Sequence, residues 1–293
     1  MSSRQFSAGA FALLLIGGAA IGFGAIFVRW SDVNPVASAF WRMALAAPPL
    51  WLWAWAVREQ DRAAGKRIGF TPVLALAGVY FAGDIGVWHL ALHHTTVSNA
   101  SLLSNFAPIF IALWMWKVHK TRFARVFLIG MVLALVGAVL LVGPNAGAPG
   151  GHGRLFGDGL GLLSAVFYAA YQWVIKDGRE QYSTARLMAW STTVTGLALL
   201  PFALAAPGPF LPQSAAGWWP LLALGLIAQI GGQTVIAYAF AHLPAALAST
   251  SLLIQPLTAA AAAWVLFAEV LSPPQIAGGI LLLAGLYLAK RGG

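Results

Sequence analysis

Two stretches of this 293-residue chain match, Val97-Ser-Asn-Ala-Ser-Leu-Leu-Ser-Asn-Phe-Ala-Pro108 and Ala245-Ala-Leu-Ala-Ser-Thr-Ser-Leu-Leu-Ile-Gln-Pro256. In each, eleven residues rich in small side chains precede a proline, and an apolar run follows it. Such a match indicates a duplicated unit, and many membrane carriers hold their substrate between two related halves. The two stretches therefore predict a membrane protein built from two repeats.

The composition points to the same class of protein. Hydrophobic residues make up 60% of the chain and charged residues 9%, and the mean hydropathy is +0.79. A soluble domain has about 25% charged residues. The apolar residues come in runs of about 20, the length at which a helix spans a bilayer, and they lack the alternation of barrel strands. We expect an all-α, polytopic integral membrane protein. The chain has no cysteine, and nothing in it predicts a cofactor or a metal site.

Ten transmembrane helices are expected, in two halves. The longest loop, Pro144 to Leu155, is rich in glycine and proline and divides the chain near its middle. We therefore predict a first five-helix repeat at 1–148 and a second at 149–293. The expected spans are roughly Ala8 to Val28, Val36 to Val57, Pro72 to Leu92, Thr96 to Trp116, Arg125 to Gly143, Phe156 to Lys176, Ala185 to Ala206, Trp218 to Ala241, Ala245 to Phe267 and Pro274 to Ala289.

The distribution of cations predicts the orientation of the chain. With the N-terminus in the cytoplasm, fourteen of the seventeen Lys and Arg residues fall on the cytoplasmic side, whereas Arg29 and Arg154 lie outside and Arg42 lies within a span. This asymmetry follows the positive-inside rule. It accounts for the net charge of +9 without nucleic acid. We expect a multi-pass protein of the bacterial inner membrane with both termini cytoplasmic. Five spans per half is an odd number, so the second half is inverted.

Several motifs resemble one family of transporters. The second half contains Gly157-Asp-Gly-Leu-Gly-Leu-Leu-Ser-Ala-Val-Phe-Tyr-Ala-Ala-Tyr, the stretch ending at Pro256, Trp264-Val-Leu-Phe-Ala-Glu269 and Gln275-Ile-Ala-Gly-Gly-Ile-Leu-Leu-Leu-Ala-Gly285. In the second span, Phe40-Trp-Arg42 adds to these. Over nearly its whole length the chain resembles the EamA family of the drug/metabolite transporter superfamily, and within it the aromatic amino acid exporter YddG group.

This resemblance implies ten helices, an inverted 5+5 repeat and the export of small metabolites. The first half departs from the family pattern at one place. Where the family has an acidic residue after the fourth helix, this chain has the basic Lys117-Val-His-Lys120. Any role of that acid is therefore not expected in the first half.

Ionisable residues inside the bilayer are the first candidates for a site, because burying a charge in hydrocarbon is costly and such groups usually face a cavity or a partner. Arg42 and Asp84 lie about 9 and 12 Å from the outer ends of consecutive antiparallel spans, at 1.5 Å per residue. Either group could bind a substrate's carboxylate or ammonium, or Asp84 could take up a proton. Alternatively, the two form a structural ion pair. His89 is expected to be a polar packing residue.

Further candidates are polar and aromatic residues that recur on one face of a span. They could wall a cavity in which Tyr and Gln bind amino acid head groups and rings stack on an aromatic side chain. The alternative is hydrogen bonding between packed helices. Most of the thirteen tryptophans fall at span ends, as in an aromatic belt. The candidate substrate-binding residues are Tyr80, Asp84, Trp88, Tyr168, Tyr171, Gln229, Gln233, Tyr238, Trp41 and Arg42.

The two matched prolines, Pro108 and Pro256, are candidate hinges. A proline removes a backbone hydrogen bond and kinks its helix, and small residues ahead of each allow neighbouring helices to approach closely. Kinked, closely packed helices suit rocking between two states. A fixed bend is the alternative, because membrane helices tolerate proline without any motion.

The sequence therefore predicts a transporter that exports small amphipathic metabolites, amino acids including aromatic ones, by alternating access. A phosphorylated-sugar or nucleotide-sugar exchanger would need several cations at mid-membrane, and Arg42 is the one available. An intramembrane enzyme is the alternative from another class, but no catalytic motif is present, so we expect no enzyme. A channel would show a filter loop or a charged ring. Proton-linked and facilitated export both remain open, as does the oligomeric state.

Overall fold

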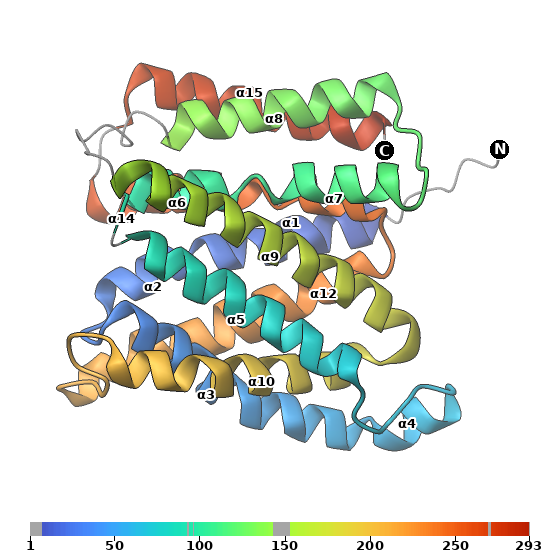
Figure 1. Cartoon of the computed structure of the whole chain (residues 1–293), viewed down its shortest axis with the longest axis vertical. Coiled ribbons are helices and arrows are strands. Elements are labelled where there is room, and N and C mark those ends of the chain that lie inside the picture. Colours follow the sequence, from blue (N-terminus) through green and yellow to red (C-terminus); the bar gives the residue numbers. More distant parts are fainter. Residues whose placement is uncertain (1–7, 93, 96, 143–152, 269–270, 293) are drawn as a thin grey trace.

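The computed structural model describes residues 8–92, 94–95, 97–142, 153–268 and 271–292, and every regular element in these ranges is helical (Figure 1). Ten helical segments cross the bundle in this part of the chain, which confirms the all-α, ten-span fold. They are α1 (Ala8–Gly22) with α2 (Gly24–Trp30), α3 (Pro35–Ala56), α5 (Pro72–Leu92), α6 (Val97–Ser104) with α7 (Ala107–Lys117), α8 (Arg125–Val142), α9 (Gly153–Gln181), α10 (Thr184–Ala205), α11 (Trp218–Ala223) with η3 (Leu224–Gln233) and α12 (Thr234–Phe240), α13 (Ala245–Ser251) with α14 (Ile254–Phe267), and α15 (Pro273–Gly292).

The two halves have opposite orientations. Helices α1 and α9, the first of each half, run in opposite directions across the bundle (Figure 1). Helix α1 begins and α15 ends at the same end of the bundle, which also carries the short α4 (Arg58–Ala63) (Figure 1). The described chain therefore crosses the bundle an even number of times, as two inverted halves require. The predicted boundary at 148/149, Glu269, and the side chains of His89 and Arg154 lie outside the described residues.

Helices α8 and α15, the last of each half, pack side by side at one edge of the bundle (Figure 1). Their contact is made by glycines seven residues apart, which fall on one helix face. A Cβ atom at Gly285 would lie 2.3 Å from the backbone nitrogen of Ala134, and one at Gly137 would lie 2.4 Å from that of Leu282. Small residues let membrane helices approach to backbone contact, so this pair depends on its glycines.

The matched prolines begin new helical pieces instead of kinking continuous helices, which corrects the expectation from sequence. The fourth span is interrupted at Asn105–Phe106 and the ninth at Leu252–Leu253. Pro108 and Pro256 follow within the first turn of α7 and α14, where the backbone N–H that proline lacks would have no partner within the helix. Discontinuous helices at corresponding places in two halves are a common feature of transporters. Their role as hinges stays a prediction.

The centre of the eighth span is a π-helix, η3, which the sequence pattern did not predict. Gly232 at its end lies against α1, since a Cβ atom there would be 3.1 Å from the carbonyl oxygen of Gly17. π-Helical turns often occur at functional sites. Both Gln229 and Gln233 belong to η3, so the irregular backbone coincides with two candidate site residues.

Helices α3 and α10 are tied together at the end where α3 begins. The Asn34 side chain caps α3 by accepting a hydrogen bond from the backbone N–H of Ala37 at 2.7 Å. Its amide nitrogen donates to the carbonyl of Pro209 at 3.2 Å, in the segment after α10. One side chain therefore both starts α3 and holds it to the end of α10.

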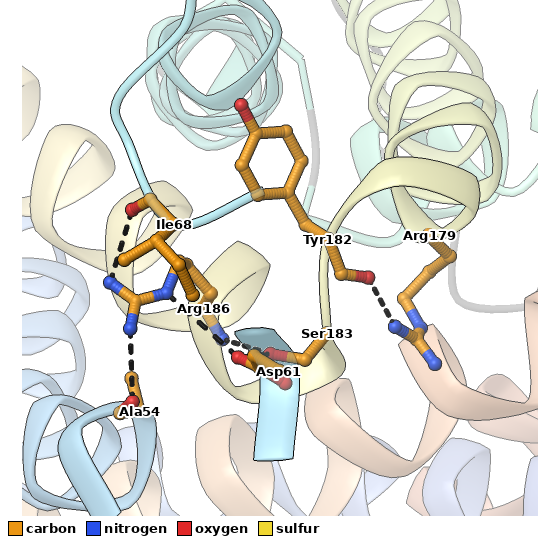
Figure 2. Close-up of polar contacts among 7 residues, drawn as sticks. All are labelled: Ala54, Asp61, Ile68, Arg179, Tyr182, Ser183 and Arg186. Atoms are coloured by element: carbon orange, nitrogen blue, oxygen red, sulfur yellow. Dashed lines mark hydrogen bonds and ion pairs between the residues drawn. The ribbon is translucent and has the colours of Figure 1, made fainter. Parts of the chain in front are cut away.

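The opposite end of this pair is tied by a buried arginine, shown in Figure 2. Arg186 at the start of α10 donates from Nη2 to the carbonyl of Ala54 at 3.0 Å and from Nη1 to that of Ile68 at 3.3 Å. Its Nε lies 4.0 Å from Oδ2 of Asp61, which accepts a hydrogen bond from Ser183 at 2.7 Å. Because both ends are fixed, α3 and α10 form one rigid pair.

A matched pair of glycine substitutions tests the close packing of α8 and α15. Gly285→Ala places a methyl group against the backbone of α8, and overpacking of this kind costs about 1–3 kcal/mol. Gly86→Ala in α5 meets nothing within 4 Å and gains helix propensity of up to about 1 kcal/mol. We expect thermal unfolding of the purified protein to show a lower midpoint for Gly285→Ala and an unchanged or higher one for Gly86→Ala. Equal midpoints for the two variants would contradict this packing.

Candidate functional site

A cavity of about 270 Å³ lies between the two halves. Its walls come from α1, α3, α5 and the break between α6 and α7 in the first half, and from α9, η3 and α14 in the second. Both interrupted spans thus contribute to it. Its polar lining consists of Arg42, Asp84, Ser104, Asn105, Gln233 and Gln255.

Arg42 is fixed by a relay of neutral side chains. Its Nε donates a hydrogen bond to Oε1 of Gln229 at 3.0 Å, and Nε2 of Gln229 donates to the hydroxyl of Thr192 at 3.0 Å. Gln229 and Thr192 are fully buried. The other end of the guanidinium is different, since its Nη2 is buried without a hydrogen-bond partner. Arg42 is therefore held at one side and unsatisfied at the other.

Asp84 is fixed independently of Arg42. Its Oδ1 accepts a hydrogen bond from the hydroxyl of Ser164 on α9 at 2.6 Å. Although Arg42 and Asp84 line the same cavity, no ion pair joins them in the described part of the chain. The structural ion pair considered from sequence is thus wrong, because each group has found a neutral partner on a different helix.

An aromatic wall forms one side of the cavity. The ring of Phe81 stacks on that of Tyr171, with centroids 4.5 Å apart, and Tyr171 stacks on Tyr168 at 6.2 Å. Gln255 donates from Nε2 to the hydroxyl of Tyr168 at 3.3 Å. Phe81, Tyr168 and Trp88 line the cavity, and Tyr171 supports them from behind. The cavity therefore offers two opposite charges beside stacked rings.

Five of the predicted site residues line this cavity, namely Arg42, Asp84, Trp88, Tyr168 and Gln233. Two more, Tyr171 and Gln229, are buried directly behind it. Most of the polar and aromatic residues predicted from sequence therefore lie at or directly behind this cavity.

Three predicted residues lie elsewhere. Trp41 donates from Nε1 to the carbonyl of Phe210 at 2.9 Å, away from the cavity lining. Tyr80 lines a separate apolar groove beside Trp114. Tyr238 is 42% exposed, with its ring 4.5 Å from that of His242.

Helix geometry explains the misplaced tyrosines. Residues four apart are displaced by about 40° per step around an α-helix of 3.6 residues per turn. Tyr80, Asp84 and Trp88 are spaced in this way, so Tyr80 lies off the face that lines the cavity. The observed face of α5 carries Phe81, Asp84, Ile85 and Trp88, spaced as on one side of a helix. Tyr238 lies in α12, five residues after Gln233, which is about 140° around an α-helix, so it lies away from the face of Gln229 and Gln233.

Gln255 and Asn105 were not predicted, and they line the cavity at the two helix breaks. A signal was present, because both are polar residues in apolar runs, within three positions of the matched prolines. Phe81 was also missed, since a single aromatic residue in an apolar span gives no pattern.

Comparison with known proteins gives one family match. The model of the EamA-like transporter family matches residues 8–143 and, separately, 155–291. A solved crystal structure of a protein has a TM-score of 0.78 to this chain at 16% identity, covering 96% of this chain and 98% of that one. At that identity the likeness shows a common fold.

Curated relatives are transporters by name. An uncharacterized transporter of Archaeoglobus fulgidus is 29% identical over 269 residues, 90% of this chain and 91% of its own. The pseudopaline exporter CntI of Pseudomonas aeruginosa is 26% identical over 220 residues, 75% of each chain. A probable terminal-alkyne amino-acid exporter of Streptantibioticus cattleyicolor is 27% identical over 225 residues, 75% of this chain and 73% of its own.

Substitution of Gln229 tests the relay that fixes Arg42. Gln229→Leu leaves Nε of Arg42 without its acceptor, and an unsatisfied buried donor costs about 1–3 kcal/mol, with more for a charged group. We expect a lower thermal midpoint for Gln229→Leu. Gln229→Glu keeps an acceptor and should stay near the parent, as should Gln60→Leu at an exposed position. A parental midpoint for Gln229→Leu would show that the relay contributes nothing to stability.

Proposed function

The chain belongs to the EamA-like transporter family, of the drug/metabolite transporter superfamily, and from that premise we propose that it exports small amphipathic metabolites, amino acids including aromatic ones, by alternating access around the central cavity. One observation carries the choice of substrate. The cavity presents a guanidinium and a carboxylate that are held by separate neutral partners and not by each other.

Such a pair of charges suits a zwitterion. The carboxylate of an amino acid would accept hydrogen bonds from the unsatisfied Nη2 of Arg42, in a charge-assisted contact about twice as strong as a neutral one. Its ammonium group would lie against Asp84. Phe81, Trp88 and Tyr168 would receive an apolar or aromatic side chain, where ring stacking adds about 0.5–1.5 kcal/mol.

The cavity disfavours a phosphorylated sugar or nucleotide sugar. Arg42 is the one cation of its lining and Asp84 would repel phosphate. The volume of about 270 Å³ also lies below the roughly 300–1,000 Å³ of drug-sized sites. The name of the terminal-alkyne amino-acid exporter among the relatives supports an amino acid as the class of substrate.

Alternating access is supported by the helix breaks. The interrupted fourth and ninth spans occupy corresponding places in two inverted halves, and both reach the cavity. Inverted halves can exchange tilts, which would move the opening from one membrane face to the other. Under this proposal the backbone at the turns that precede Pro108 and Pro256 changes conformation when the halves exchange tilts.

We further propose that the protein lies in a bacterial inner membrane with both termini cytoplasmic. Helix α4 and the connection between α7 and α8 share one end of the bundle with the start of α1 and the end of α15 (Figure 1). These segments carry most of the cations, which favour the cytoplasmic side.

Arg42 is the first residue to test. We expect Arg42→Gln to lower saturable flux of the preferred amino acid by about 10- to 100-fold, because a hydrogen bond to a charged group contributes about 1.5–3 kcal/mol. The assay is flux from proteoliposomes loaded with Trp, Phe, Thr, Met or a nucleotide sugar. Arg122→Gln, an exposed cation of the α7–α8 connection, is the matched control and should keep parental flux. Parental amino acid flux in Arg42→Gln would contradict the proposed site.

The orientation can be tested by labelling, since the chain has no native cysteine. Arg62→Cys on α4 and Gln213→Cys in the segment after α10 place single thiols at exposed positions, and α4 and the end of α10 lie at opposite ends of the bundle (Figure 1). In intact cells, a membrane-impermeant maleimide should label Gln213→Cys at once and Arg62→Cys after permeabilisation. The reverse pattern would place the termini outside.

A further inference from the structure

A second pocket, lined by apolar and polar residues, lies at the cationic end of the bundle, away from the central cavity. Its volume is about 480 Å³, and its walls come from α1, the junction of α3 and α4, the turn between α9 and α10, and α12. The residues on which the argument depends are Asp61, Arg179, Ser183, Thr234 and Tyr238. The proposed central site makes no use of them.

Thr234 points to a ligand, because its hydroxyl is buried without a partner. The residue is 8% exposed, lines the pocket, and its Oγ1 makes no hydrogen bond. Four other helical threonines donate to the carbonyl four residues earlier, namely Thr193, Thr195, Thr250 and Thr258. Thr234 follows directly on η3, whose shifted bonding pattern explains the difference. A buried hydroxyl without a hydrogen-bond partner is destabilising, and a ligand that bonds to it would recover that loss.

Arg179 supplies an unpaired cation to the same pocket. It donates from Nη1 to the carbonyl of Tyr182 at 2.5 Å, while its Nε is buried without a partner. Figure 2 shows the contact of its guanidinium with the carbonyl of Tyr182. Among the ion pairs of the described residues, none includes Arg179. Part of the hydrogen-bonding capacity of Arg179 is therefore unused in this pocket.

Asp61 supplies the opposite charge. It is 6% exposed, and Ser183 donates to its Oδ2 at 2.7 Å, much as Ser164 donates to Asp84 at 2.6 Å. Arg186 lies 4.0 Å from the same oxygen. The pocket resembles the central cavity in its partly unsatisfied guanidinium, its carboxylate held by a serine and its aromatic ring from Tyr238, and differs in that Asp61 also pairs with Arg186.

The two pockets lie in line along the same helices. Leu13 lines the second pocket and Ile21 the central cavity, about 12 Å apart along α1. On the facing span, the adjacent residues Gln233 and Thr234 line the central cavity and the second pocket respectively. Between them α1 touches η3, since a Cβ atom at Gly17 would lie 2.9 Å from the carbonyl oxygen of Gly232. This glycine contact lies between Leu13 and Ile21 along α1.

We propose that this pocket is a second binding site for the zwitterionic substrate, on the side from which an exporter loads. The substrate's carboxylate contacts Arg179 and Thr234, its ammonium lies against Asp61, and it waits there until the contact of Gly17 with Gly232 opens toward the central cavity. This inference rests on the proposed function, because it takes the same class of substrate.

Equilibrium binding to the purified full-length protein tests the proposal, with radiolabelled Trp, Phe, Thr and Met as probes. A probe that binds should occupy two sites per protein. Arg42→Gln should remove one and Arg179→Gln the other. Thr234→Val keeps the side-chain shape and should weaken binding at the second site about 5-fold, as expected for the loss of one hydrogen bond. If Arg179→Gln does not fold, Thr234→Val tests the second site in its place. Arg122→Gln should keep both sites.

The proposal of a second site would be overturned if Arg179→Gln still bound two ligands per protein and Thr234→Val kept the parental affinity at both sites. A single site in the parent that Arg42→Gln abolishes would also overturn it, and in that case the proposed function would stand. Binding of none of the four amino acids to the parent would instead refute the proposed function, and the second site with it.

Discussion

Every polar group that this chain places inside the bilayer needs a partner within the protein, because hydrocarbon offers none. Arg42 meets this demand through Gln229 and Thr192, a relay that joins α3, η3 and α10. The same relay leaves one guanidinium nitrogen without a partner. Stability and binding are therefore coupled at one side chain, since the contact that holds Arg42 also positions a residue that lines the cavity.

The packing around this centre divides into rigid pairs and interrupted helices. Helices α8 and α15 touch at backbone distance through their glycines, and α3 and α10 are tied at both ends by Asn34 and Arg186. The interrupted fourth and ninth spans and the π-helix η3 lie between these pairs and line the cavity. The backbone is irregular where it surrounds the cavity, which is where membrane proteins tolerate it.

Span positions and the duplication were predictable from the sequence, because apolar runs and the matched prolines are local patterns. The effect of the prolines on the helices was not predictable from the sequence. A proline in the first turn of a new helix and a proline inside a kinked helix look alike in sequence. The π-helix left no local signal in the sequence. The partner of Arg42 was also hidden, because Gln229 lies 187 residues away and only the folded bundle brings the two together.

The central claim is that one cavity recognises both charges of a zwitterion. The most direct measurement compares three ligands that share a ring, L-phenylalanine, 2-phenylethylamine and 3-phenylpropionate, in flux from proteoliposomes that contain the unmodified protein. The first carries both charges, and the others lack the carboxylate or the ammonium. The account predicts a kcat/KM for phenylalanine at least about 10-fold above either analogue, as the loss of one charged hydrogen bond implies. Equal values for the three ligands would contradict it.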